Sequence, residues 1–282
     1  MFLLLSSLLC AKPVLSLERL RDVLYQYYPD QVVQYADDLG EGKGAFDPDP
    51  RIDFSKVNCT TWWQQVIAKG YAATPKEELE VLDRIRYYDG AIGFATRKHF
   101  LDRALLLDPV PFENIEEAKI SGCKADVRRD VVLQLSHFTQ SHRFACSLYR
   151  ADVEEIRFAY FSPNALLQCL DNLSDGVYMI FPVASRQYNE IWGKKSGPMG
   201  RVHGLILDKE VGVAQVYHAS IDKNKVQRLP AQSYIESLAA VNFDGYQLYR
   251  LHSQLAQPVY SESHKQALRC EDETYRGNII QR

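Results

Sequence analysis

The stretch that decides the fold is NCTTWW, residues 58–63, because it combines a helix start with a reactive side chain. Asn58 is a favourable N-cap residue, and the apolar side chains after it recur at helical spacing as far as Gly70. This pattern predicts a helix that begins at Cys59. In the first turn of a helix, free backbone N–H groups and the helix dipole both favour a thiolate. Cys59 is therefore a candidate nucleophile.

Two histidines lie further along the chain, on a predicted β-hairpin. Short apolar runs predict strands over residues 202–207 and 211–218, which carry His203 and His218. The histidines are fifteen positions apart, so a turn near residues 209–211 would place them roughly opposite each other on antiparallel strands. His203 is then a candidate general base for the thiol, and His218 a candidate third member that orients the imidazole.

Composition excludes several classes of protein. The chain has 282 residues, of which 46% are hydrophobic and 24% charged, as in an ordinary globular protein with a sizeable core. Its net charge is -3 and it contains no run of Lys and Arg, so we expect no nucleic-acid partner. No Cys or His pair has the spacing of zinc ligands, so we expect no metal and no other cofactor.

The predicted elements form a helical front and a strand-rich back. Helical spacing predicts helices over residues 17–25, 31–39 and 75–87, with Thr74 as a cap, and residues 40–50 form a predicted loop. Further on, short apolar runs predict strands over residues 131–138, 156–161, 177–183 and 246–251, and helices over residues 163–173 and 231–240. We therefore expect one α+β domain with an N-terminal helical extension.

The first ten residues form an apolar run that is too short to span a bilayer, for which about 20 residues are needed. We interpret residues 1–16 as a secretory signal with a cleavage site near Leu17, because small residues precede that position. A buried N-terminal helix is the alternative. Lipid attachment at Cys10 is not expected, since no small residue directly precedes it. We expect export to the periplasm, without stable insertion in the membrane.

Removal of such a signal leaves five cysteines, Cys59, Cys123, Cys146, Cys169 and Cys270. An odd number of cysteines in an exported protein leaves one thiol free. This count fits a catalytic Cys59 with up to two disulfides among the other four, which allow three connectivities. Five buried thiols in a cytoplasmic protein are the alternative.

Several segments resemble one known family. Cys59, His203 and His218, in this chain order, resemble the NlpC/P60 superfamily of papain-like cell-wall hydrolases. The resemblance is more specific to the DUF1460 branch, an N-acetylmuramoyl-L-alanine amidase-like family. It covers about residues 50–252 and is carried by residues 54–63 around the nucleophile, by IRYYDG and TRKHF at residues 85–90 and 96–100, and by residues 202–206 and 217–220 around the histidines.

The resemblance implies a papain-like NlpC/P60 fold of the α+β class, in which the nucleophile helix packs on an antiparallel sheet. With the patterns above, it divides the chain into a signal (residues 1–16), a helical extension (17–50), a catalytic domain (51–257) and a C-terminal tail (258–282). The implied activity is hydrolysis of the amide between the lactyl group of N-acetylmuramic acid and L-alanine. Peptidoglycan or muropeptide fragments are the implied partners. In this reaction the Cys59 thiolate attacks, and His203 passes its proton to the leaving nitrogen.

The resemblance also implies substrate contacts by five residues near the cleft: Arg86, Tyr87, Asp89, Arg97 and His99. The two arginines suit the carboxylates of the peptide stem, although an ordinary charged surface is the alternative. Other functions stay open: an NlpC/P60 endopeptidase that cuts the stem peptide after D-glutamate, a non-catalytic muropeptide-binding protein, or an acyltransferase on the same scaffold. The sequence leaves the oligomeric state open.

Overall fold

The computed structural model describes residues 12–26, 33–35, 40, 48–115, 120–135, 153–187, 189, 200–238, 243–256, 262–263 and 265–270. Its main sheet has six antiparallel strands in the order β3-β10-β6-β7-β8-β9. These strands are β3 (Phe112–Asn114), β6 (Gly176–Ala184), β7 (Leu205–Glu210), β8 (Val213–Ser220), β9 (Lys225–Pro230) and β10 (Phe243–Leu251).

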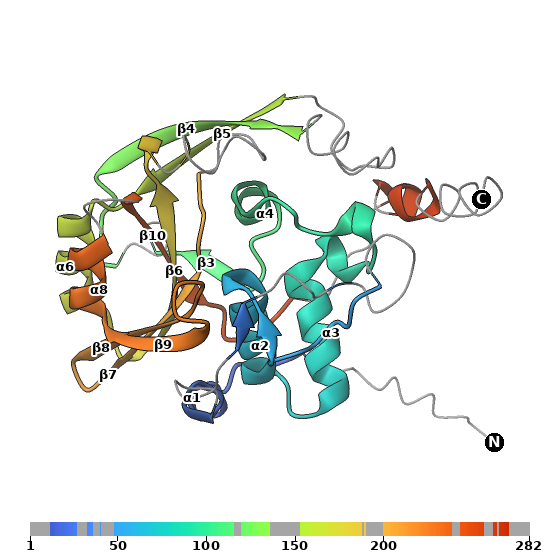
Figure 1. Ribbon diagram of the computed structural model, residues 1–282, viewed down its shortest axis with the longest axis horizontal. Coiled ribbons are helices and arrows are strands. Elements are labelled where there is room, and N and C mark those ends of the chain that lie inside the picture. Colours follow the sequence, from blue (N-terminus) through green and yellow to red (C-terminus); the bar gives the residue numbers. More distant parts are fainter. Residues whose placement is uncertain are drawn as a thin grey trace, which may run out of the picture.

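Helices cover both faces of this sheet (Figure 1). On one face lie α1 (Leu17–Gln26) and α2 (Cys59–Tyr71), with α3 (Pro75–Arg86) beside α2, and on the other lie α6 (Pro163–Asn172) and α8 (Ala231–Leu238). Alternate side chains of a strand point to opposite faces of a sheet. Because helices cover both faces here, every residue of β6 is buried. Met179 and Phe181 join the core with α2, whereas Tyr178 and Ile180 join the core with α6.

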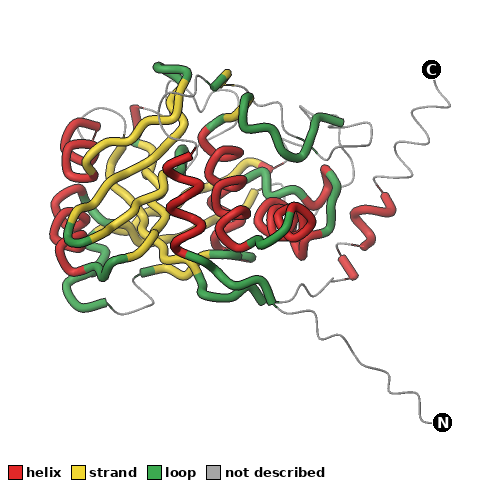
Figure 2. Tube along the Cα trace, turned by 90° about the horizontal axis from the view of Figure 1, so that it is seen from below, coloured by secondary structure: helices red, strands yellow, loops and turns green. Residues whose placement is uncertain are grey.

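The other elements are short or stand apart from the main sheet. They are β1 (Gln34–Tyr35), β2 (Lys56–Val57), 3-10 turns at Tyr88–Gly90 and Phe94–Thr96, α4 (Leu101–Leu107), β4 (Val127–Gln134) and β5 (Val153–Tyr160). β4 and β5 pair with each other, and each begins a few residues earlier than predicted. In the view from below, the strands lie between two groups of helices (Figure 2).

The predicted helices over residues 17–25, 75–87, 163–173 and 231–240 are confirmed in their described parts, and α2 begins at Cys59 as predicted. Asn58 Oδ1 accepts the backbone N–H of Thr61 at 2.8 Å, and Thr61 Oγ1 accepts the N–H of Asn58 at 2.9 Å. This reciprocal capping box satisfies N–H groups that the helix itself leaves unpaired. Local residues therefore fix the start of α2.

The predicted helix over residues 31–39 is wrong in its described part. Gln34 and Tyr35 form β1, which runs parallel to β2, and the Gln34 N–H donates to the Ser55 carbonyl at 2.8 Å. Val33 beside them is buried in the core. Helical propensity is a weak preference that tertiary pairing readily overrides. This strand pair brings Tyr35 to the start of α2.

The hairpin of β7 and β8 is confirmed, but its register differs from the prediction. Its turn consists of Val211 and Gly212, with φ angles of 49° and 78°, as the favoured two-residue hairpin turn requires. β7 begins at Leu205, not at residue 202. His203 therefore lies before the strand rather than on it, and it is not directly opposite His218.

A disulfide joins Cys123 to Cys169 on α6, with their Cα atoms 4.5 Å apart. Cys270 is also disulfide-bonded, whereas Cys59 is free. Cys146 lies outside the described residues. Among the described cysteines, the expectation of one free thiol at Cys59 is therefore confirmed.

The chain before α1 is joined to the chain after β10. Leu15 N–H donates to the Ser253 carbonyl at 2.9 Å, and Val14 pairs with Gln254. Residues 1–11 of the predicted signal and most of the predicted tail lie outside the described residues. No helix within the described ranges is long and apolar enough to cross a membrane.

The disulfide generates a stability prediction. We expect the double variant Cys123→Ala/Cys169→Ala to lower the free energy of unfolding by about 2–5 kcal/mol, because the bond closes a long loop and restricts the unfolded chain. Urea unfolding followed by tryptophan fluorescence measures the loss. Equal stability of the oxidised wild type and the variant would contradict the prediction.

Candidate active site

Cys59 is the first residue of α2, and its free thiol is buried. Its Sγ lies near four donors: the hydroxyls of Tyr35 and Thr60, and the backbone N–H groups of Thr60 and Gly204. Burial raises the pKa of the Cys59 thiol, and these hydrogen bonds act in the opposite direction. The thiol is therefore protonated at rest, with donors in place for a thiolate.

Tyr35 is a site residue that the sequence did not reveal. The pairing of β1 with β2 carries it to the start of α2, where the Cys59 backbone N–H donates to the Tyr35 hydroxyl oxygen at 3.4 Å. Its own O–H proton is then available to the sulfur. The sequence pattern predicted a helix over residues 31–39 and gave no sign that Tyr35 lies beside Cys59. Only the pairing of β1 with β2 places it there.

His203 and His218 meet as predicted, although not as directly opposed strand residues. His203 Nε2 lies 3.0 Å from His218 Nδ1, and the two rings are nearly perpendicular, at 87°. One of these nitrogens carries the shared proton and the other accepts it. Because this contact uses Nε2 of His203, its Nδ1 is the nitrogen that remains for another partner.

Desolvation favours the neutral form of both imidazoles, of which His218 is buried and His203 is partly exposed. It lowers the pKa of His203 from 6.5 to about 4. It also lowers the pKa of His218, and the neighbouring His203 adds to that effect. His218 Nε2 is buried without a hydrogen-bond partner in the described structure, and the Tyr234 ring of α8 lies 5.3 Å from the imidazole. A positive charge here is costly unless an anion forms at the same time.

Gly204 lets the segment that contains His203 approach the helix α2, which begins at Cys59. A Cβ at this position would come within 2.5 Å of the Trp63 indole, so only glycine permits this approach. Among the described residues, no hydrogen bond joins Cys59 Sγ to an imidazole. The link between the two parts is the Gly204 N–H beside Sγ, immediately after His203 in the chain.

Two of the predicted substrate contacts lie inside the protein. Arg86 is 2% exposed, and its guanidinium donates to Gln64 Oε1 at 3.2 Å and to the Arg51 carbonyl at 3.0 Å. Tyr87 is fully buried and donates to the Gly40 carbonyl at 3.4 Å. These hydrogen bonds hold the backbone at the two ends of the predicted loop over residues 40–50, at Gly40 and at Arg51.

The other three predicted contacts, Asp89, Arg97 and His99, are partly exposed. His99 Nε2 lies 2.8 Å from the Phe94 carbonyl, and Arg97 pairs with Tyr87 through the backbone. Lys98 between them is buried and forms an ion pair with Asp108 at 3.0 Å.

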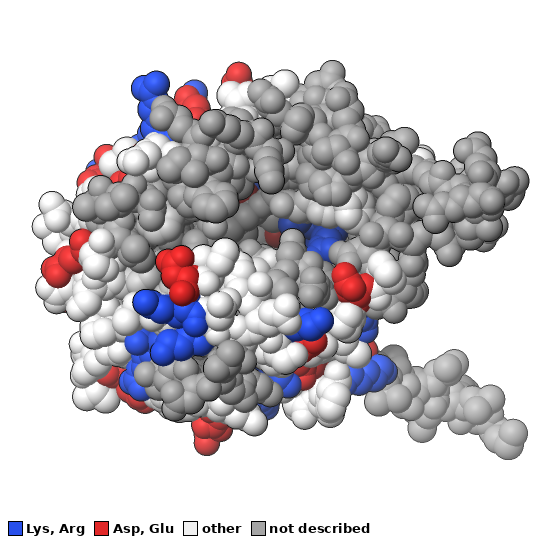
Figure 3. All heavy atoms as spheres, viewed as in Figure 1, with Lys and Arg blue, Asp and Glu red and all other residues white. Residues whose placement is uncertain are grey.

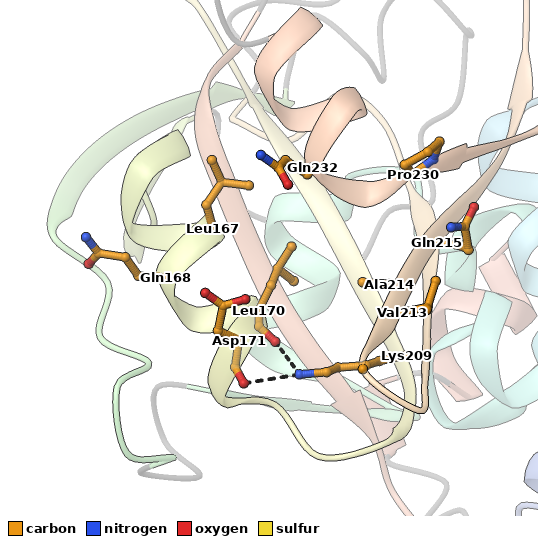
Figure 4. A pocket seen from close by; sticks show the side chains of 11 residues that line it. Leu167, Gln168, Leu170, Asp171, Lys209, Val213, Ala214, Gln215, Pro230 and Gln232 are labelled. Atoms are coloured by element: carbon orange, nitrogen blue, oxygen red, sulfur yellow. Dashed lines mark hydrogen bonds between the residues drawn. The ribbon is translucent and has the colours of Figure 1, made fainter.

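Among the described residues, charged side chains of both signs are mixed over the face seen in Figure 3. A pocket of about 390 Å³ lies elsewhere, between α6 and the β7–β8 hairpin (Figure 4). The buried Lys209 in its lining donates to the Leu170 and Asp171 carbonyls at 2.6 and 3.3 Å. The ammonium group of Lys209 is therefore already hydrogen-bonded to the end of α6. In the described part of the chain, no group of His, Cys, Asp and Glu side chains could hold a metal ion.

Solved structures share this fold. The Legionella pneumophila protein LPG0564, of family DUF1460, is 14% identical with a TM-score of 0.68, over 86% of this chain and 91% of that one. An N-acetylmuramoyl-L-alanine amidase of Bacteroides uniformis is 16% identical with a TM-score of 0.60, over 83% of this chain and 99% of that one. No curated protein matches the sequence significantly.

A family model gives the stronger assignment. The model of the AmiA-like, N-acetylmuramoyl-L-alanine amidase-like family matches residues 33–240. This range includes β1 with Tyr35, the helix α2 that begins at Cys59, and both His203 and His218. The protein therefore belongs to the N-acetylmuramoyl-L-alanine amidase-like family.

Proposed function

We propose that the protein is a cysteine amidase of the papain-like NlpC/P60 type, which hydrolyses the bond between N-acetylmuramic acid and L-alanine in peptidoglycan or muropeptides. Family membership supports the substrate class. The observation that carries the mechanism is the hydrogen-bonded pair of His203 and His218, next to the helix start that holds the free thiol of Cys59.

The reaction begins with transfer of the Cys59 proton to His203 Nδ1. His203 Nε2–H then donates to His218 Nδ1, which steadies the imidazolium and fixes its orientation. The thiolate attacks the lactyl carbonyl carbon. The backbone N–H of Cys59 and the Tyr35 hydroxyl are the nearby donors for the oxygen that becomes negative.

Collapse of this intermediate breaks the amide bond. The imidazolium returns its proton to the departing nitrogen of L-alanine, which leaves a thioester between Cys59 and the lactyl group. Water then attacks the thioester while His203 removes its proton. Release of the lactyl carboxylate restores the thiol and the neutral imidazole.

Burial favours coupled charge formation in this site. A lone thiolate or a lone imidazolium is disfavoured, as the raised pKa of Cys59 and the lowered pKa of His203 indicate. When the proton passes between them, both charges appear together and attract each other in a medium of low dielectric constant. We infer that proton transfer accompanies attack on the substrate.

The partly exposed residues Asp89, Arg97 and His99 are the candidates for substrate contact. Arg97 suits a stem carboxylate. Arg86 and Tyr87, by contrast, support the loop ends and act on the substrate only through the backbone that they hold. We also propose an exported protein, because the Cys123–Cys169 disulfide fits an oxidising compartment such as the periplasm.

Loss of the thiol tests the proposal. We expect Cys59→Ala to lower kcat by a factor of about 10⁴ or more, as removal of a nucleophile does in other hydrolases. Mass spectrometry of digested muropeptides identifies the bond. An intact peptide that begins with L-alanine supports the amidase, whereas a free L-alanyl-D-glutamate would show an endopeptidase. Equal hydrolysis by wild type and variant would contradict the cysteine mechanism.

The pH profile is a second test. The active form has a neutral imidazole and a proton on the thiol, so kcat/KM should fall on the acid side only near pH 4, where His203 becomes protonated. On the alkaline side it should fall above the ordinary thiol pKa of 9.0. Initial rates on a muropeptide from pH 3.5 to 10 measure this plateau. An acid limb near 6.5 would show that burial does not depress the pKa of the base.

A further inference from the structure

The segment that carries His203 lies outside the continuous pairing of β6 with β7 and meets β6 at one isolated bridge, between Val183 and Arg201. The pairing of β6 with β7 begins at Ile180 and Leu205, after His203. Before that point, the backbone contacts are the Ala184 N–H to the Gly200 carbonyl at 2.8 Å and the Val202 N–H to the Pro182 carbonyl at 3.3 Å. The position of His203 therefore depends on what else holds residues 200–204.

One buried carboxylate binds both the backbone and a side chain of this segment. Asp102 lies on α4, and its oxygens accept the N–H groups of Gly200 at 2.8 Å and of Arg201 at 3.1 Å. Arg201 Nη1 donates to the same carboxylate at 2.8 Å, and the two side chains are only 3% and 4% exposed. A Cβ on Gly200 would come within 2.5 Å of Asp102 Oδ1.

The guanidinium of Arg201 is held on its other sides as well. Its Nε donates to Gln247 Oε1 on β10, and its plane lies over the Phe158 ring on β5, with its centre 4.1 Å from the ring centroid. Gln247 Nε2 in turn donates to the Ala159 carbonyl at 2.6 Å. The pair therefore ties α4, β5 and β10 to the residues that precede His203.

We propose that Asp102 and Arg201 are positioning residues that hold His203 in place beside Cys59. The inference rests on the proposed function, because it concerns the same site. His203 follows Arg201 by two residues, and its own successor Gly204 meets the nucleophile helix. The ion pair thus fixes one end of the segment, and α2 fixes the other. A buried ion pair contributes little net stability. We therefore assign to this contact the role of fixing the backbone that leads to His203.

The substitution Asp102→Asn tests the proposal. Asparagine has one acceptor oxygen, so its amide group must face an N–H group of Gly200 or Arg201. The rate of alkylation of Cys59 by iodoacetamide, measured across pH with mass spectrometry to locate the adduct, reports how His203 acts on the thiol. We expect the dependence of the alkylation rate on pH in Asp102→Asn to become like that of His203→Ala. We also expect kcat on muropeptide to fall at least about tenfold, with KM changed less than about twofold.

Asp208→Asn is the matched control. Asp208 is also a buried carboxylate, 5% exposed and paired with Arg21 at 3.0 Å, but it lies at the other end of β7. We expect this variant to lose stability and to keep the wild-type alkylation profile and kcat. A folded Asp102→Asn protein with a wild-type profile would overturn the proposal, as would equal profile changes in both variants.

Arg201→Lys covers the case in which Asp102→Asn does not fold. Lysine keeps the charge, but its single ammonium cannot replace the guanidinium fork to Asp102 and Gln247. We expect a smaller shift in the same direction, and an unchanged profile would overturn the proposal. Alkylation of Cys59 requires no muropeptide, so it tests the positioning role independently of the proposed function. If the wild type hydrolyses no muropeptide but the variants still shift the pH dependence of alkylation, the positioning role is supported and the proposed function fails. No effect of His203→Ala on alkylation would overturn both.

Discussion

The contact of Trp63 with Gly204 is the interaction on which the arrangement of this protein depends. It lets the start of α2 approach the chain that precedes β7 so closely that no side chain fits between them. Trp63 also packs edge-on against Phe112 and Phe181 of the main sheet. The same helix is therefore both a core element and the carrier of the Cys59 thiol, and the packing of the core brings this thiol to the segment that contains His203 and Gly204.

That packing has an electrostatic consequence. The start of α2 packs on the sheet, where Cys59 and His218 are buried and His203 is partly exposed, and desolvation favours the neutral form of each group. The donors near the sulfur oppose this effect only in part. In the proposed mechanism, this neutral site also holds hydrogen-bond partners for charges that form only during the reaction, which is a form of preorganisation.

Charged side chains of this protein include buried and partly exposed ones, which a sequence pattern cannot separate. Arg86, Arg201 and Lys98 are buried, and each holds backbone or a carboxylate in a fixed place. Arg97 is partly exposed and suits contact with a ligand. Arginine serves both purposes because its planar fork of donors binds a carbonyl, a protein carboxylate or a substrate carboxylate equally well. Burial alone distinguishes them.

The sequence by itself determined the local features: the capped start of α2 at Cys59, the hairpin that follows His203, and the order of Cys59 and the two histidines. These features depend on side chains within a few residues of one another, so a short sequence pattern is enough to predict them. Only the tertiary structure decided that Tyr35 lies on a strand beside Cys59, that His203 precedes its strand, and that Arg86 is buried. Strand pairing and burial depend on residues far apart in the chain, whose approach no local pattern records.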